Sequence, residues 1–326
     1  MSLLEVRNLS VRYPAAGRIK AMLTGMHNRF VDAVIGVSLE IAPATTLAIV
    51  GESGSGKSSL ARAITGLTPA AEGTIVFDGA VPFTAGGRPG KSYHREVAMM
   101  FQDPVSSLSP RRTVKSLITE PFVIHGSGGR NLGEEARRLL GLVGLPADFA
   151  DRYPHQLSGG QARRVGVARA IALNPKLIIA DEPTAGLDVS VQGEILNLLN
   201  RLQRELGLTY MIITHNLAIV RHISDRTAIM YMGRVVEEGP TLEIFAAARH
   251  PYTAALIAAQ PNPDPARRRS GPVLTGEVTS LLTRPPGCEF HARCPRRIDI
   301  CSREVPDAVM VGNGHMARCH HMIASS

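Results

Sequence analysis

The residues with the clearest chemistry lie in a short glycine-rich segment, GESGSGKSS, at positions 51–59. Its fixed positions fit the pattern G-x-x-x-x-G-K-[ST], and they are Gly51, Gly56, Lys57 and Ser58. In this pattern backbone N–H groups converge on phosphate oxygens, the lysine reaches the β- and γ-phosphates, and the hydroxyl binds Mg²⁺. The other residues of the expected phosphate cradle are Ser53, Gly54, Ser55 and Ser59. Because an apolar run precedes the segment and a helical pattern follows it, we predict a strand, a phosphate-binding loop and a helix in that order.

Two carboxylates follow another apolar run that is typical of a buried strand. Asp181 and Glu182 come directly after residues 177–180, and Pro183 then stops the strand. This is the position expected of an Mg²⁺-binding carboxylate and a neighbouring carboxylate that polarises water, at the carboxyl edge of a sheet. Acidic residues also follow strands by chance. In a chain that carries a phosphate-binding loop, the pair favours a catalytic interpretation.

Three further residues stand at the ends of predicted strands. Gln102 is placed where it could reach a metal ion or water, and His215 where it could contact a γ-phosphate. Tyr13 follows the first strand, where an aromatic ring could stack on adenine. Each has a structural alternative, since strand-end residues are often solvated, capping or packing residues. Spacing alone does not decide between the two interpretations.

A second anion site is indicated by the segment LSGGQ at positions 157–161. Ser158, Gly159 and Gly160 place a hydroxyl and accessible backbone amides at the start of a predicted helix. One nucleotide rarely needs two such sites from one chain. The alternative is a helix N-cap with no ligand.

The elements that must position these residues follow an α/β pattern. Strands are predicted at 3–7, 34–41, 72–79, 96–101, 177–180 and 209–214, with a hairpin at 226–239. Helices are predicted at 114–124, 134–143, 165–173, 190–206 and 241–248. Residues 80–92 read as a Gly/Pro loop, and residues 14–33 have no clear form. The region from 111 to about 170 is therefore a helical insert between strands.

Composition sets broad limits on function. The 326 residues are 44% hydrophobic, with a net charge of +8 and a pI near 9.7. This charge is compatible with a nucleic-acid partner, an anionic membrane surface, or a nucleotide-handling protein docked under a membrane. No apolar run approaches a membrane span, and the first residues lack a secretory signal pattern, so we expect a cytoplasmic protein.

The cysteines are confined to the end of the chain. They stand at Cys288, Cys294, Cys301 and Cys319, with the spacing C-x5-C-x6-C-x17-C. This spacing matches neither common zinc sites nor ferredoxin runs, and a cytosolic location argues against disulfides. Zn²⁺, an iron–sulfur cluster and free thiols remain as alternatives. Residues 260–269 read as a Pro- and Arg-rich linker. The region after it is too small for a large core of its own, so we expect a metal centre to stabilise it.

The motifs together resemble the nucleotide-binding subunits of ABC transporters. The matching features occur in the family's order and spacing, and they are Tyr13, GESGSGKSS, Gln102, LSGGQ, LIIADEP, the turn ending at Asp188, and His215. The segments FQDPVSSLSP, YPHQLSGGQ, LDVSVQ and HPYTAAL resemble the oligopeptide/dipeptide importer branch. The resemblance implies a P-loop NTPase fold of the ABC type, with an antiparallel β subdomain, a helical insert at about 108–170 and a small cysteine-rich extension. It implies a nucleotide-binding domain at 1–248 and an extension at 249–326.

The resemblance also implies a role for each candidate residue, with ATP and Mg²⁺ as cofactors. These roles are adenine stacking for Tyr13, Mg²⁺ binding for Ser58, Gln102 and Asp181, coupling for Gln102, general base for Glu182, γ-phosphate contact for His215, a signature at Ser158, Gly159, Gly160 and Gln161, and a dimer-face position for Asp188. Two subunits of the family sandwich two ATP molecules, each signature facing the partner's phosphate loop. This arrangement would explain the second anion site. The segment CEFHARCPRRIDIC is similar to the corresponding segment of family members in which four cysteines hold a [4Fe-4S] cluster.

The resemblance implies a peripheral motor on the cytoplasmic face of the inner membrane. Its expected partners are a second ATPase subunit, identical or paralogous, two transmembrane permease subunits, and an extracytoplasmic solute-binding protein reached through the permeases. The alternative is a soluble ABC-type ATPase acting on nucleic acid or ribosomes. The compact insert has no coiled-coil arm and the chain has one ATPase unit, which favours the transporter and no nucleic-acid partner.

Overall fold

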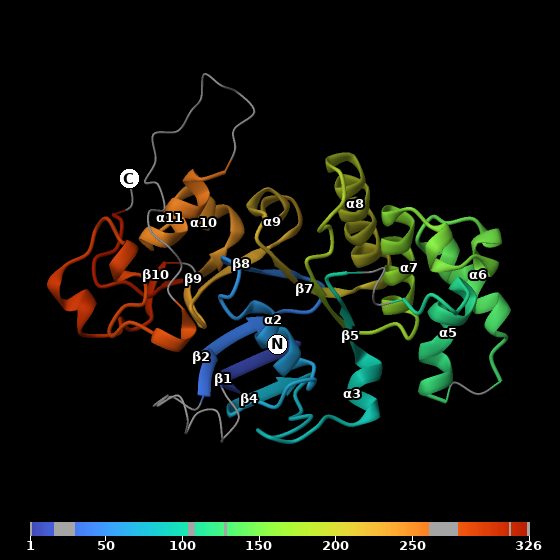
Figure 1. The fold of residues 1–326 in the computed structure, drawn as a ribbon, viewed down its shortest axis with the longest axis horizontal. Helices are drawn as coiled ribbons and strands as arrows, with labels where there is room; N and C mark the ends of the chain where they lie inside the picture. Colours follow the sequence, from blue (N-terminus) through green and yellow to red (C-terminus); the bar gives the residue numbers. More distant parts are fainter. Residues whose placement is uncertain are drawn as a thin grey trace.

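The structure is a computed structural model that describes residues 2–15, 30–103, 108–126, 129–260, 280–312 and 314–324. Within these ranges the main sheet has eight strands in the order β10-β11-β9-β8-β3-β7-β6-β5 (Figure 1). The strands are β3 Thr46–Val50, β5 Val97–Met100, β6 Leu177–Asp181, β7 Thr209–Thr214, β8 Arg226–Tyr231, β9 Arg234–Pro240, β10 Val309–Gly312 and β11 His315–Ala317. Strands β5, β6, β7, β3 and β8 run parallel, whereas β9, β11 and β10 add antiparallel pairs.

The parallel strands are apolar along their length because helices and a second sheet cover both of their faces. Along β6, Ile178 and Ala180 pack against the helical side, and Leu177 and Ile179 pack against the opposite side. The alternation follows from the two-residue period of a strand. Polar side chains are therefore placed at the carboxyl ends of these strands.

The side that faces Leu177 and Ile179 is covered by α2 (Lys57–Ile64) and by a small antiparallel sheet. This sheet has the order β2-β1-β4, formed by β1 Leu4–Pro14, β2 Phe30–Ile41 and β4 Glu72–Phe77. In Figure 1 the three strands lie below α2. The antiparallel subdomain of the predicted fold is thus present.

The opposite side is covered by the helices of the predicted insert and the helix after it. These are α5 Val114–Ile124, α6 Leu132–Leu142, α7 Gly159–Ile171 and α8 Val189–Leu206. Helices α5 and α6 form one end of the molecule, away from the C-terminus (Figure 1). Among the described residues, every helix is too short or too polar to cross a membrane.

The structure differs from the predicted elements in several places. Helix α3 (Lys91–Glu96) covers the last two residues of the predicted loop 80–92, the unassigned residues 93–95 and the first residue of the predicted strand 96–101, because six residues are too few to show a helical period. Helix α10 (Thr241–Ala246) lies within the predicted helix 241–248, but α11 (Pro251–Ala258) and the short 3₁₀ turns after it were not predicted, and β11 then pairs with β9. The extension thus adds strands to the main sheet, which the sequence did not predict. The predicted linker, residues 260–269, lies outside the described residues except for Gln260.

Candidate functional site

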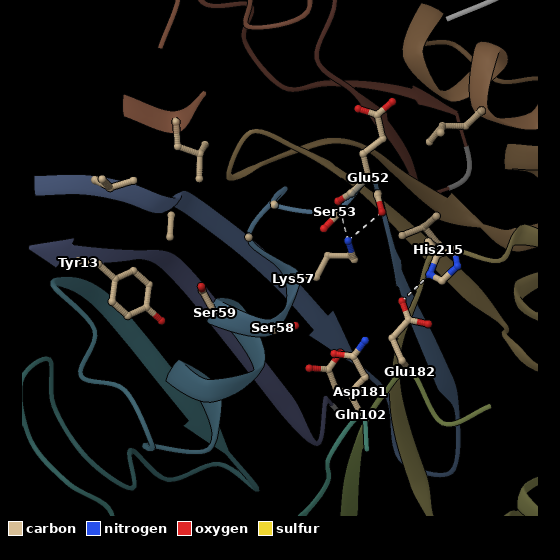
Figure 2. A pocket seen from close by; sticks show the side chains of 18 residues that line it. Tyr13, Glu52, Ser53, Lys57, Ser58, Ser59, Gln102, Asp181, Glu182 and His215 are labelled. Atoms are coloured by element: carbon tan, nitrogen blue, oxygen red, sulfur yellow. Dashed lines mark hydrogen bonds and ion pairs between the residues drawn. The ribbon is translucent and has the colours of Figure 1, made fainter. Parts of the chain in front are cut away.

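A cavity of about 880 Å³ lies between the carboxyl ends of the parallel strands and the antiparallel sheet (Figure 2). Its lining includes most of the predicted site residues: Tyr13, Gly51, Ser53, Gly54, Gly56, Lys57, Ser58, Ser59, Gln102, Asp181, Glu182 and His215. The volume falls within the range of small-molecule sites in proteins. Residues that the sequence separates by some 200 positions are thus brought to one site.

The phosphate loop connects β3 to α2, and two of its glycines are required by close packing. A Cβ on Gly51 would lie 2.2 Å from the carbonyl oxygen of Met230, and one on Gly56 would lie 2.1 Å from that of Ala33. Gly56 also has a φ of +99°, which other residues rarely adopt. The loop therefore has its path fixed by neighbouring backbone, with the N-terminus of α2 facing the cavity.

Lys57 is buried at the start of α2, and its ammonium group bonds to oxygens of its own loop. Nζ donates to the carbonyl oxygens of Gly51 and Glu52, both at 2.8 Å, and to Ser55 Oγ at 3.3 Å. Burial lowers the pKa of Lys57, and the nearby carboxylates oppose this shift. Phosphate oxygens would compete for the same three hydrogens. Ser55, predicted as part of the cradle, holds the lysine and does not itself line the cavity.

Asp181 ends β6 and is buried beside the phosphate loop. Burial raises the pKa of its carboxyl group, and a hydrogen bond from the Ser58 hydroxyl opposes that rise. A hydroxyl, a carboxylate and the amide oxygen of Gln102 are the hard oxygen ligands that Mg²⁺ takes in proteins. Figure 2 shows Ser58, Gln102 and Asp181 in the same part of the cavity. The residues present therefore fit an Mg²⁺ ion.

Glu182 and His215 form the second polar pair of the site. His215 Nδ1 lies 2.7 Å from Glu182 Oε1, and the backbone N–H of Glu182 donates to the carbonyl oxygen of Ile213. Glu182 has a φ of +51°, an uncommon backbone conformation that is typical of functional sites. Its side chain is 12% exposed, whereas that of His215 is 71% exposed. The carboxylate is thus held toward the cavity by its backbone and by the imidazole.

Tyr13 lies in another part of the cavity, on β1 (Figure 2). Apolar residues line the same cavity, and they are Val31, Ala33, Val50, Leu256 and Leu281. An aromatic ring beside an apolar wall suits a purine base, so the structure is compatible with the predicted stacking role. Leu256 and Leu281 belong to the extension; Leu256 ends the segment HPYTAAL, whereas no motif in the sequence marked Leu281.

The signature residues and Asp188 do not line this cavity. Ser158 caps α7 through a capping box, in which its Oγ accepts from the Gln161 N–H and Gln161 Oε1 accepts from the Ser158 N–H. Asp188 caps α8 by accepting from the Val191 N–H at 2.9 Å. A Cβ on Gly160 would lie 2.7 Å from Val191 Cγ1, so the two helix starts are in contact. Ser158, Gly159 and Asp188 are exposed, which leaves this surface open to another molecule.

Arg163 was not assigned a role from the sequence. It is buried, and its guanidinium donates to the carbonyl oxygens of Gln102 and Ala185, both at 3.1 Å. It therefore links the helix of the signature to the Mg²⁺ side of the cavity and to the turn after Glu182. An arginine beside Arg164 in a helical pattern gives no signal of such a role.

The four cysteines lie in one region of the extension, without a disulfide between them. The Cys288 N–H donates to the carbonyl oxygen of Cys301 at 2.8 Å. Burial raises the pKa of the Cys288 thiol to about 12, and the charges of Cys301 and Cys319 act in the same direction. In the part of the chain that the structure describes, no group of three or more His, Cys, Asp or Glu side chains is placed to hold a metal ion.

Comparisons with known proteins identify the family. Residues 34–185 match the family described as ABC transporter, and residues 236–301 match the family described as oligopeptide/dipeptide transporter, C-terminal region. The chain is 46% identical to a probable peptide ABC transporter ATP-binding protein, y4tS, of Sinorhizobium fredii, over 98% of this chain and 90% of that protein. It is 42% identical to the oligopeptide transport ATP-binding protein AppF of Bacillus subtilis, over 98% and 97% of the two chains.

Solved structures show the same fold. A dimeric ATP-binding cassette, MJ0796, in a post-hydrolysis state with ADP and Pi, aligns with a TM-score of 0.62 at 28% identity, covering 73% of this chain and 98% of that one. The chain therefore belongs to the ABC transporter family and has the P-loop ATPase fold of its ATP-binding cassettes. Within that family it belongs with the ATP-binding proteins that carry the oligopeptide/dipeptide transporter C-terminal region. The predicted family, fold class and ATPase identity are confirmed.

Proposed function

We propose that this ATPase is the motor subunit of an importer for di- or oligopeptides. The main support is that the phosphate loop, Asp181 and the Glu182–His215 pair line one cavity. The chain is also similar over nearly its whole length to peptide transport ATP-binding proteins. The alternative, an ATPase acting on nucleic acid or ribosomes, is not favoured, since the relatives named above are transport proteins. The basic net charge then fits a position beside an anionic membrane surface.

Each cavity residue has a proposed role in hydrolysis. Lys57 and the loop amides bind the β- and γ-phosphates, and Tyr13 stacks on adenine. Ser58, Gln102 and Asp181 hold Mg²⁺, which supplies charge neutralisation on the phosphates. Glu182 accepts the proton of the attacking water, and His215 orients Glu182 through the 2.7 Å contact and reaches the γ-phosphate. The site is thus assembled from the ends of four parallel strands, β3, β5, β6 and β7, together with helix α2 and strand β1.

The exposed signature surface is proposed to complete the site of a second ATPase subunit. Ser158, Gly159, Gly160, Gln161 and Asp188 would face the partner's phosphate loop, because none of them lines this chain's own cavity. Closure of the dimer would move the helical insert against two permease subunits at the cytoplasmic face of the inner membrane. An extracytoplasmic solute-binding protein would deliver the peptide to those permeases. In this proposal residues 1–248 are the nucleotide-binding domain and 249–326 its extension.

Reconstitution with the permeases and binding protein tests this function. The complex in vesicles is expected to hydrolyse ATP faster when the binding protein carries a di- or oligopeptide, and to take up labelled peptide. Nickel and glutathione serve as comparison solutes. Stimulation by one of these but not by peptides would overturn the peptide assignment. Stimulation by nucleic acid alone would overturn the transport assignment.

We propose that Cys288, Cys294, Cys301 and Cys319 hold a [4Fe-4S] cluster. The thiols are near enough for the charges of neighbouring cysteines to raise the pKa values of Cys288, Cys294 and Cys319. Four thiolates are the usual ligands of such a cluster. The segment CEFHARCPRRIDIC is similar to family members in which four cysteines hold a [4Fe-4S] cluster, and this resemblance favours the cluster over Zn²⁺.

Metal analysis of anaerobically purified protein checks this assignment. About four irons and four sulfides per chain are expected, with broad visible absorbance. Cys301→Ser is expected to lose most of the iron, whereas the neighbouring Ser302→Ala is expected to keep it. A colourless preparation with one zinc per chain would contradict the cluster but keep a metal staple. A preparation without either metal would contradict both.

A further inference from the structure

The second residue of the phosphate loop, Glu52, is held from outside the loop. Its backbone N–H donates to the Tyr252 hydroxyl at 3.0 Å, and Tyr252 belongs to α11. Its carboxylate accepts two hydrogen bonds from Arg293, at 2.8 Å from Nη1 to Oε2 and 3.0 Å from Nη2 to Oε1. Its carbonyl oxygen accepts from Lys57 Nζ. The extension thus supplies the partners of two of the three polar groups of Glu52.

The Arg293–Glu52 pair has the geometry of a strong interaction. Two parallel N–H···O bonds between a guanidinium and a carboxylate fix orientation as well as distance. The Arg293 side chain is 7% exposed and that of Glu52 is 21% exposed, so water screens the pair only in part. The hydrogen bond with Glu52 raises the pKa of Arg293, so the guanidinium stays charged. Figure 2 shows the Glu52 side chain pointing away from Ser58 and Asp181.

Arg293 is itself positioned by a cluster of aromatic rings. The ring centroids of Tyr231, Tyr252 and Phe290 lie 4.7–5.4 Å apart. The guanidinium carbon lies 5.9 Å from the Tyr231 ring and 6.0 Å from the Phe290 ring. Tyr231 ends β8 in the main sheet, and Tyr252 and Phe290 are fully buried. The arginine is therefore held by the core and not by a surface loop.

The extension also reaches the other end of the loop. Arg284 donates to the carbonyl oxygen of Asp32 at 3.0 Å. The next residue, Ala33, presents its own carbonyl to Gly56 so closely that a Cβ there would clash. Leu281 and Leu256 complete the apolar wall of the cavity. The extension thus contacts the phosphate loop near its start, at Glu52, and the strand residues beside its end, next to Gly56.

We propose that the C-terminal extension is a positioning element of the nucleotide site, acting through the Arg293–Glu52 pair and the Tyr252 hydroxyl. These contacts hold the backbone of the loop in the shape that presents its N–H groups to phosphate. Because an ordered loop loses less conformational freedom when nucleotide binds, the contacts raise affinity for ATP and ADP. Arg293 and Tyr252 are positioning residues, since they act on nucleotide only through Glu52. The inference rests on the proposed nucleotide site.

A double-mutant cycle on the full chain tests the pair. Arg293→Met and Glu52→Gln are each expected to weaken binding of a fluorescent ADP analogue about 10-fold, the size expected for losing a pair of charge-assisted hydrogen bonds. The double variant is expected to match either single variant, because each substitution removes the same contact. Arg293→Lys keeps the charge without the two-point geometry, and it is expected to recover only part of the affinity. Arg297→Met, an exposed arginine on the same segment, is the matched control and is expected to bind as the wild type.

Three outcomes separate the possibilities. Wild-type affinity in Arg293→Met, or single effects that multiply in the double variant, would overturn the inference while leaving the nucleotide site intact. A wild-type protein that fails to bind ATP or ADP would overturn the proposed function itself. If Arg293→Met does not fold, as judged by thermal unfolding, Tyr252→Phe decides, because it removes only the hydroxyl that accepts from Glu52. Its nucleotide affinity is expected to fall about 3-fold, and an unchanged affinity would contradict the inference.

Discussion

Replacing Glu182 by Gln is expected to lower ATP turnover by about 10²- to 10⁴-fold, which is the contribution typical of a general base. The amide has nearly the shape of the carboxylate but cannot take the proton of the attacking water. Nucleotide binding is expected to remain, because the phosphate loop and Asp181 are unchanged. The variant should then accumulate as a closed, ATP-bound dimer. Phosphate release and the dimer population of the purified protein measure the two effects.

The matched control for this experiment is Glu205→Gln, which removes a carboxylate at the exposed end of α8, away from the cavity lining. It is expected to hydrolyse ATP at the wild-type rate. If Glu182→Gln also kept a near wild-type rate, Glu182 would not be the base. A loss of nucleotide affinity in Glu182→Gln would instead indicate that the carboxylate orders the loop.

The parallel sheet was predictable from sequence because most of its strands are short apolar runs. The run 209–214 coincides with β7, and 177–180 differs from β6 only by Asp181. Helix α8 was predicted within one residue because its apolar face repeats with a clear helical period. The short helix α3 and the strands β10 and β11 were not predicted, since segments of three to six residues show too little periodicity.

The residues proposed for catalysis were predictable for a different reason, namely that each belongs to a motif with a fixed position relative to a strand. Asp181, Glu182 and His215 follow two strands that are neighbours in the sheet, so their convergence followed from the topology. The contact between Glu182 and His215 was not predicted, because it depends on the backbone conformation of Glu182. Arg163 and Leu281 were missed because burial and cavity lining depend on packing between distant segments.

The cysteine region contacts the phosphate loop through one residue. Arg293, the residue before Cys294, binds the carboxylate of Glu52 in that loop. Because Arg293 lies next to Cys294, a structural change among the cysteines can displace Arg293 and so alter its hydrogen bonds to Glu52. The nucleotide affinity of Cys301→Ser therefore measures whether the order of the cysteine region affects the phosphate loop.

Replacing Ser158 by Arg is expected to abolish ATP-driven closure of the dimer while leaving nucleotide affinity of the single chain unchanged. Ser158 is exposed at the start of α7 and does not line the chain's own cavity. An arginine there would add bulk where the γ-phosphate of the partner's ATP approaches. ATP would then no longer make the closed dimer lower in free energy than the open state. Size-exclusion chromatography with ATP in the Glu182→Gln background measures closure, and a fluorescent nucleotide measures affinity.

Loss of the helix cap must be separated from this effect, because Ser158 accepts the Gln161 N–H and its replacement costs about 0.5–2 kcal/mol of helix stability. Asn131→Arg is the matched control, since Asn131 caps α6 at the exposed end of the molecule. It loses a cap and gains the same charge, yet it is expected to close with ATP as the wild type does. If Ser158→Arg removed nucleotide binding by the isolated chain, Ser158 would serve its own site. The assignment of the signature to a partner's nucleotide would then be wrong.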